Sequence, residues 1–492
     1  MAPTPVKVSP PADTPPTDPT PPVGHLGSIW KFAVPVGIGI ALWFLPAPDG
    51  LQVKAWHMFA VFVATIAGIM TAPLPMAAVA IIGATAGVLV GVVSFVDVTK
   101  STGTDLVWLV MLAFFISRGV IKTGLGRRIA LLFMRLLGKR TVGLGYGLIL
   151  TELVISPAMP SITARAGGVM LPITRAIAEV LGSHADDPES RGKVGSYLIL
   201  CAFHANIVAA GMFITAMAGN PLVVKLAADQ GVSISWLDWA VAASVPGLLC
   251  LAIIPAAMLW IAPPHVRRTP DATALAQREL IAMGPISVKE IIMAMIFLGL
   301  LVLWIFGEDL DVGATLAAAL GVSLLFITGV LTWQDALNEK SAWDTMIWIG
   351  LLIMLASKLN EYGMVSWFGK EFGAHLAGFP RLAVYMVVAL IYCYIHYFFA
   401  SATAHISALF PLSMALMVAA GIPPFTAAVA LGILSNINGC LTQYGIGSGP
   451  VMYGAGYVPQ GQWWTAGFLM SLIYMVVWLV VGPLWWKVLG HV

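Results

Sequence analysis

The sequence predicts an all-α polytopic membrane protein of two inverted repeats, with about eleven transmembrane helices and two re-entrant helical hairpins. Three observations lead to this fold class. Of the 492 residues, 59% are hydrophobic and 10% are charged, whereas an ordinary soluble domain has about 25% charged residues. Apolar segments of roughly 18 residues or more, long enough to cross a membrane, recur along most of the chain. A five-residue motif occurs twice, 240 residues apart, which indicates an internal duplication.

The chain opens with a proline-rich segment, residues 1–27, that has few bulky apolar residues; we expect a disordered tail. Basic residues gather in the loops after the fourth and sixth apolar segments. By the positive-inside rule these loops are cytoplasmic, which places the N-terminus in the cytoplasm and the C-terminus outside. The eleven predicted spans are 28–46, 55–72, 77–96, 105–122, 194–228, 236–262, 288–306, 312–331, 343–360, 424–455 and 464–487.

Two further apolar segments, 142–182 and 383–416, are interrupted by Pro, Ser, Thr and small residues. Non-helical backbone at membrane depth has to be buried in protein or line a wet cavity, because lipid cannot satisfy its N–H and C=O groups. We therefore predict two re-entrant hairpins. The first belongs to a first membrane repeat, 28–262, and the second to a second repeat, 288–492. A cytoplasmic linker, 263–287, joins the repeats.

Each predicted hairpin carries one copy of the motif: Ser-Ile-Thr-Ala-Arg begins at Ser161, and Ser-Ala-Thr-Ala-His begins at Ser401. Ser117 maps onto Ser357 with the same offset of 240, so the match extends beyond the motif. If the first half holds an odd number of crossings, its copy has the opposite orientation in the membrane.

The motif residues predict a site for a small anion. Interrupted helices leave N–H groups and positive dipole ends that attract anions near the midplane. Ser and Thr add hydroxyl donors, and Arg165 and His405 add cationic groups where charge is otherwise costly. Two alternatives stay open: the hydroxyl residues are ordinary helix N-caps, and Arg165 forms a local ion pair with Glu152.

Later in each half, an irregular stretch rich in Gly and Pro interrupts a predicted span, at 214–221 and at 441–450. Such residues unwind helices, so we expect freed carbonyls and side chains to complete the site; the alternative is a kink that serves packing. The candidate substrate-binding residues are Ser161, Thr163, Arg165, Ser401, Thr403, His405, Thr215, Asn220, Thr442 and Gln443.

Other classes of protein find little support. The four cysteines lie in apolar segments without metal-ligand spacing, so we expect no metal, cofactor or disulfide. No H-E-x-x-H or G-x-S-x-G motif organises a metal or a nucleophile, so we expect no enzyme. The formal net charge of +2 gives no basis for nucleic-acid binding.

Both hairpin motifs, the Thr-Ala-Met-Ala-Gly-Asn-Pro stretch and the Leu-Thr-Gln-Tyr-Gly stretch resemble the divalent-anion/sodium symporter (DASS) superfamily, from about residue 30 to the end. The resemblance is to its exchanger branch, which includes bacterial citrate/succinate and tartrate/succinate antiporters and plastid 2-oxoglutarate/malate translocators. It implies a homodimer, surrounded by membrane lipid, in which a transport part moves against a scaffold by elevator-type alternating access. We expect the bacterial inner (plasma) membrane.

The family motif is usually Ser-Asn-Thr, but its middle position is Ile162 in the first copy and Ala402 in the second, and a histidine of the last motif is Gln443 here. In sodium-coupled members those asparagines help to form sodium sites, so their loss beside Arg165 and His405 argues that fixed cations replace bound sodium.

We therefore predict a sodium-independent exchanger of dicarboxylates or related organic anions, of the malate, succinate, tartrate, citrate or 2-oxoglutarate type. Exchange is expected because an empty site with buried positive charge is costly to move. A sodium-coupled di/tricarboxylate symporter is the first alternative; an anion channel and an integral membrane enzyme are further ones.

Overall fold

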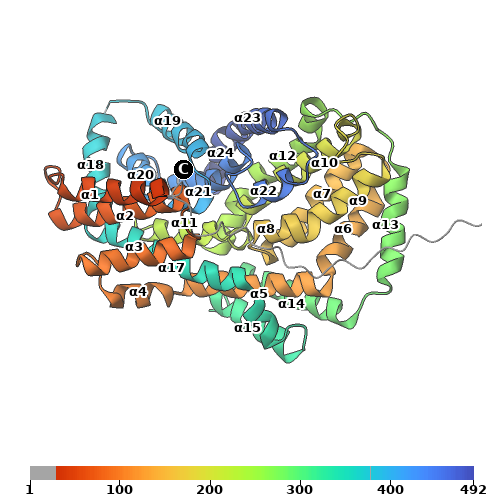
Figure 1. Cartoon of the computed structure of the whole chain (residues 1–492), viewed down its shortest axis with the longest axis horizontal. Coiled ribbons are helices and arrows are strands. Elements are labelled where there is room, and N and C mark those ends of the chain that lie inside the picture. Colours follow the sequence, from red (N-terminus) through yellow and green to blue (C-terminus); the bar gives the residue numbers. More distant parts are fainter. Residues whose placement is uncertain (1–28, 308, 377, 492) are drawn as a thin grey trace, which may run out of the picture.

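The computed structural model describes residues 29–307, 309–376 and 378–491, and the predicted tail, 1–27, lies outside them. Within these ranges the chain forms helices joined by turns, without a β-strand. Ten of the described helices are long and apolar enough to cross a membrane. The predicted all-α polytopic fold is confirmed (Figure 1).

The predicted spans match helices: seven of them are among the ten long helices, and four correspond to shorter apolar helices. The span predicted at 77–96 is too long, because its helix ends at Leu89. Two residues later Gly91 takes a φ of 75°, a left-handed conformation that favours glycine and turns the chain out of the helix. The helices of the spans are α1 (Ile29–Phe44), α2 (Val53–Thr71), α3 (Met76–Leu89), α5 (Asp105–Thr123), α10 (Gly195–Met212) with α11 (Gly219–Ala228), α12 (Trp236–Ile261), α14 (Val288–Phe306), α15 (Ala314–Ile327), α17 (Lys340–Glu361), α21 (Pro424–Ile437) with α22 (Ser448–Tyr453), and α23 (Gln460–Val476) with α24 (Gly482–Val488).

Both predicted hairpins are present. In the first, α7 (Thr141–Ile155) leads through a 3₁₀ turn to the short α8 (Ile162–Arg165), which a π-helical turn joins to α9 (Leu171–Val180). In the second, α19 (Arg381–Tyr394) leads through another 3₁₀ turn to α20 (Ala402–Ala419). The backbone break before each motif is the tip of the hairpin.

The order of elements in the first half returns in the second. A short helix, α4 (Phe95–Thr102) or α16 (Trp333–Asn338), is followed by a long helix, α5 or α17, and by an amphipathic helix, α6 (Leu125–Leu137) or α18 (Met364–Leu376). A hairpin, a broken helix and a long helix then complete each half. The first hairpin arm begins at Thr141 and its counterpart at Arg381, again 240 residues apart.

Contacts between the equivalent segments of the two halves give their relative direction. Residue numbers rise along α4 and α5 while the numbers of their contacts fall along α17 and α16, so equivalent helices lie side by side in opposite directions, as inverted repeats require. The contacting pairs, in order, are Asp97 with Lys358, Ser101 with Gly350, Phe115 with Trp343, and Lys122 with Asp335.

The two outer pairs are reciprocal. Asp97 belongs to the capping box of Ser94 at the start of α4 and pairs with Lys358 at 2.9 Å. Asp335 belongs to the equivalent capping box at the start of α16 and pairs with Lys122 at 2.6 Å. The hydrogen bond from the Ser94 side chain, followed by that from Lys358, lowers the pKa of Asp97 to about 2. Each half therefore anchors the short helix of the other.

The predicted linker, 263–287, contains α13 (Pro270–Met283), which packs on α6 through the ion pair of Arg127 with Glu279 at 2.6 Å. In Figure 1, α13 and α6 lie at one end of the molecule, α1 and α18 at the other, and α8 and α11 near the middle. We retain 28–262 and 288–492 as our proposed division into repeats. The hairpin tips meet the broken helices near the centre of the molecule.

Candidate functional site

The two motif serines cap the helices that begin at the hairpin tips. The Ser161 side chain accepts a hydrogen bond from the Ala164 backbone N–H at 3.1 Å, and Ser401 accepts from Ala404 at 3.3 Å. The N-cap alternative is therefore present in the geometry. Each serine hydroxyl can still donate a hydrogen bond to a ligand, because capping uses only its oxygen as an acceptor. Both serines are half-buried.

The two motif threonines differ in exposure. Thr163 is exposed, whereas Thr403 is buried. The Thr163 hydroxyl faces the second broken helix, and a Cβ at Gly447 would lie 2.5 Å from its Oγ1. Only glycine allows the backbone of that segment to come so near to the first tip.

Arg165 is fully buried and serves as the centre of a polar cluster. Its Nε donates to Glu152 Oε2 at 2.9 Å, and its Nη1 donates to the carbonyls of Met159 and of Ala216, the latter at 2.6 Å. Glu152 Oε1 also accepts from Asn206 Nδ2 at 2.9 Å. The ion pair named as an alternative is thus formed, while Arg165 Nη2 is buried without a hydrogen-bond partner.

His405 occupies the equivalent place in the second hairpin and is also fully buried. Its Nε2 lies 2.9 Å from the Tyr392 carbonyl oxygen, and its Nδ1 lies 3.4 Å from Asn438 Nδ2. A carbonyl only accepts and an amide N–H only donates, so these partners fit the neutral imidazole with its proton on Nε2. The fixed positive charge at the tips therefore comes from Arg165.

The members of the two clusters occupy corresponding positions in the two halves. Glu152 precedes Arg165 by thirteen residues, and Tyr392 precedes His405 by thirteen. The third member also corresponds, because Asn206 binds Glu152 and the Ser435 hydroxyl lies 2.7 Å from that of Tyr392. The first cluster is charged and the second neutral. Their contacts differ too, because Glu152 binds Arg165 through its side chain, whereas Tyr392 binds His405 through its backbone carbonyl.

Two predicted ligands are already engaged in the protein frame. Thr215 Oγ1 donates to the Pro157 carbonyl at 2.7 Å and accepts from the Trp236 indole at 3.1 Å. Asn220 donates to two backbone carbonyls of its own segment and accepts from Asn436 Nδ2 at 2.8 Å. Thr215 thus fastens the first tip to the first broken helix, and Asn220 joins the two broken helices.

The two remaining candidates lie in the second broken helix. Thr442 Oγ1 is buried without a hydrogen-bond partner, as is the nearby Ser448 Oγ. Gln443 is half-buried, and its Oε1 accepts from the Trp464 indole at 2.6 Å. Thr442 is thus free to bind, whereas the carbonyl of Gln443 is occupied.

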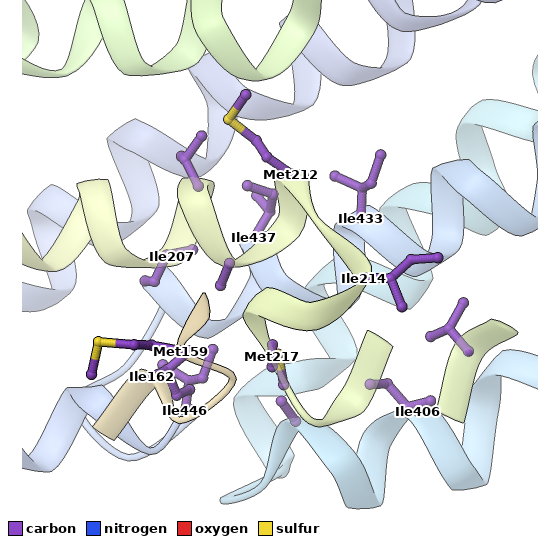
Figure 2. Close-up of a cluster of buried hydrophobic side chains, with 14 of the residues drawn as sticks. Met159, Ile162, Ile207, Met212, Ile214, Met217, Ile406, Ile433, Ile437 and Ile446 are labelled. Carbon is purple, nitrogen blue, oxygen red and sulfur yellow. The ribbon is translucent and has the colours of Figure 1, made fainter. Parts of the chain in front are cut away.

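Beneath the polar groups, apolar side chains connect all four segments (Figure 2). Ile162, at the middle position of the first motif, is 8% exposed and lies beside Ile446 of the second broken helix. Where the family motif has a carboxamide, this chain therefore has an apolar contact. The labelled members come from the first tip, α10 and its break, α20, α21 and the second break: Met159, Ile162, Ile207, Met212, Ile214, Met217, Ile406, Ile433, Ile437 and Ile446.

The sequence did not indicate Asn206, Tyr392, Ser435 or Gly447 as parts of the site. The shared interval of thirteen residues was a usable signal, but the change from Glu152 to Tyr392 hides it. In the described ranges no group of three or more His, Cys, Asp or Glu residues could hold a metal ion.

Two broken hairpins whose tips meet two broken helices within an inverted repeat define the class of secondary transporters. The family model described as "Sodium:sulfate symporter transmembrane region" matches residues 26–492. The chain belongs to this family, and the predicted membership of the DASS superfamily is confirmed. This is a family of transporters and not of enzymes.

Relatives extend over nearly the whole chain. The "Putative malate transporter YflS" of Bacillus subtilis is 48% identical over 458 residues, covering 93% of this chain and 96% of the relative. The chloroplastic "Dicarboxylate transporter 1" of Spinacia oleracea is 46% identical over 456 residues, covering 92% and 80%. The Alcanivorax borkumensis YdaH transporter structure matches with a TM-score of 0.54 and 12% identity, covering 95% and 98%, which supports the fold alone.

Proposed function

We propose that this chain is a dicarboxylate transporter that exchanges one organic anion for another without sodium. The substrate class is supported by relatives named as malate and dicarboxylate transporters. In our proposal the carboxylates bind the hydroxyls of Ser161, Thr163, Ser401 and Thr403 at the two tips. Thr442 adds a further donor, and Thr215 and Asn220 hold the frame.

The independence from sodium rests on the surroundings of Arg165. The carbonyls of Met159 and Ala216 converge on one nitrogen of its guanidinium, and converging carbonyl oxygens at a broken helix are the groups that hold sodium in other transporters. In our proposal the guanidinium of Arg165 occupies the position between these carbonyls that a sodium ion would otherwise take. The apolar contact of Ile162 with the second broken helix removes a further oxygen donor.

Glu152 affects the electrostatic basis for exchange. Glu152 balances the charge of Arg165, so the empty site carries less net charge than the sequence indicated. The unpartnered Nη2 is a second source of unfavourable energy in the empty site. A buried donor without an acceptor costs about 1–3 kcal/mol, and more when it is charged. A substrate carboxylate bound to Nη2 removes that cost, which favours the loaded site over the empty one.

Glu152 has a positioning role in this proposal. It binds Nε, and the two carbonyls bind Nη1, so Nη2 is the guanidinium nitrogen left for the substrate. The proposal also includes elevator-type movement, a homodimer and the orientation in the bacterial inner membrane predicted from the basic loops.

Counterflow in proteoliposomes tests the function. Vesicles loaded with unlabelled malate, succinate, tartrate, citrate or 2-oxoglutarate should accumulate the labelled anion, at the same rate when choline replaces sodium outside. Uptake that requires a sodium gradient and ignores the internal anion supports the symporter alternative. Anion currents without counterflow support a channel.

A further inference from the structure

The seam at which α11 and the second hairpin meet the end of α17 is joined by polar contacts around Asp229, just after the end of α11. Ser357 Oγ donates to Asp229 Oδ2 at 2.6 Å, and Asn360 Nδ2 donates to the Asp229 carbonyl at 2.6 Å. Lys225 pairs with the same carboxylate from within α11. Gln230 Nε2 donates to the Pro411 carbonyl of α20 at 3.1 Å. These bonds connect α11, α17 and α20.

Beside these bonds, α18 packs against α20. A Cβ at Gly369 of α18 would lie 3.3 Å from the Ala415 Cβ of α20, so the two helices approach closely. A cavity of about 400 Å³, lined by residues that include Asp229, Asn360 and Lys370, adjoins the bonds. Water in it offers Asp229 an alternative partner, so the contact can be broken.

The repeat-related seam is built differently. No hydrogen bond among the described residues joins α5 or α6 to the tip and second arm of the first hairpin or to α22. The first tip is also more open, since Thr163 is exposed while Thr403 is buried.

The sequence explains why the second seam has no counterpart. The glycines that follow α11 and α22, Gly231 and Gly456, have φ of 83° and 84°. Two residues before them stand Asp229 in the first half and Gly454 in the second. Ser357 has its repeat partner in Ser117, but the acceptor for such a serine is missing at that end.

We propose that Asp229 is a one-sided latch. It fastens the end of α11 to α17 through Ser357 and Asn360, while Gln230 connects the same turn to α20 of the second hairpin, and the latch biases alternating access toward the state with the first tip open. The latch rests on the alternating-access part of the proposed function. It is independent of the transported anion. A two-state equilibrium responds to any contact that is present in one state only, and this contact is present at one end only.

Labelling of a buried cysteine measures the opening of the seam. Ser407 of α20 is fully buried and lines a small cavity with Ala356 and Leu359 of α17, so Ser407→Cys reacts with N-ethylmaleimide only when the seam opens. The four native cysteines are buried, and their reaction in the unmodified chain supplies the background and reports unfolding.

Asp229→Ala is expected to raise the labelling rate of the Ser407→Cys reporter about tenfold, the equivalent of ~1.4 kcal/mol for a hydrogen bond to a charged group. Ser357→Ala, which leaves α11 untouched, is expected to act in the same direction. The matched control is Ser117→Ala at the repeat-related position, which should leave the rate unchanged.

Equal rates in the parent, Asp229→Ala and Ser357→Ala overturn the latch, and so does an equal increase in Ser117→Ala. Labelling is measured without substrate, so it separates the two proposals. A chain that exchanges no dicarboxylate refutes the proposed function while the labelling result stands.

Discussion

Replacing Arg165 by methionine separates its contribution to folding from its contribution to binding. The side chains of Arg165 and Glu152 are both 0% exposed and lie 2.9 Å apart. Removal of one partner of a buried pair costs about 3–5 kcal/mol, because the other charge stays buried and uncompensated. We expect Arg165→Met to lower the free energy of unfolding by that amount, measured by denaturant titration of the purified protein in detergent.

Adding Glu152→Gln to Arg165→Met should restore most of the lost stability. Replacement of a whole buried ion pair by neutral groups of similar volume is often close to neutral, within roughly 1 kcal/mol. The affinity for substrate should not return, because no donor replaces Nη2 for the substrate carboxylate. The truncation of a buried charged hydrogen bond costs about 2–5 kcal/mol of binding, so KM in the counterflow assay should rise at least about thirtyfold.

The matched variant is Tyr392→Phe in the second hairpin, which removes a buried hydroxyl at the position equivalent to Glu152 and leaves all charges in place. It should lower stability by about 1–2 kcal/mol with KM little changed. A double variant, Arg165→Met with Glu152→Gln, that transports with the KM of the wild type refutes Arg165 as a substrate ligand. A single Arg165→Met variant as stable as the wild type refutes the energetic argument.

Three further perturbations follow from the geometry. Gly447→Ala places a Cβ 2.5 Å from Thr163 Oγ1 and should lower the exchange rate about tenfold or more by displacing the tip. The control is Gly461→Ala, whose Cβ meets no atom within 4 Å. Equal exchange rates in the two variants would contradict the tight contact between Gly447 and Thr163. The lowered pKa of Asp97 means that the bonds of its carboxylate, first to Ser94 and then to Lys358, stabilise the fold above its ordinary pKa, near pH 4. This contribution is lost as the pH falls toward about 2. Asp97→Asn should therefore unfold more easily than the wild type at about pH 6, with a difference that shrinks toward pH 2 in denaturant titrations, and a constant difference speaks against the linkage. Asn206→Leu leaves Glu152 with one hydrogen bond fewer and should lower the free energy of unfolding by about 1–3 kcal/mol in the same titrations. Asn206→Asp, which puts two carboxylates together, should lower it further. If Asn206→Asp is the more stable of the two variants, the polar cluster is excluded as the cause.

The fold was largely predictable from the sequence, because membrane spans and broken hairpins leave local signals. The 240-residue offset aligned Ser161 with Ser401, and the first residues of α7 and α19 keep the same offset. The offset could not relate equivalent positions that carry different kinds of side chain. Glu152 and Tyr392 occupy equivalent places with unlike side chains, so an alignment by residue type could not relate them.

The site was predictable only where its residues share a segment. Thr215 and Asn220 were proposed as ligands, but their hydrogen-bond partners include Trp236 and Asn436, which lie far along the chain. Whether a polar group is free depends on such distant partners. The role of Gly447 depends on a contact with Thr163 across the two halves, which no local pattern encodes.

The apolar cluster beneath the tips bears on the temperature dependence of transport. Exposure of apolar surface carries a large positive heat-capacity change, which bends an Eyring plot. A step in which both tips and both broken helices travel as one body keeps the isoleucine and methionine side chains of Figure 2 covered and adds no such curvature. The shape of the rate-against-temperature curve for exchange thus distinguishes movement of an intact block from movement of one tip past the other.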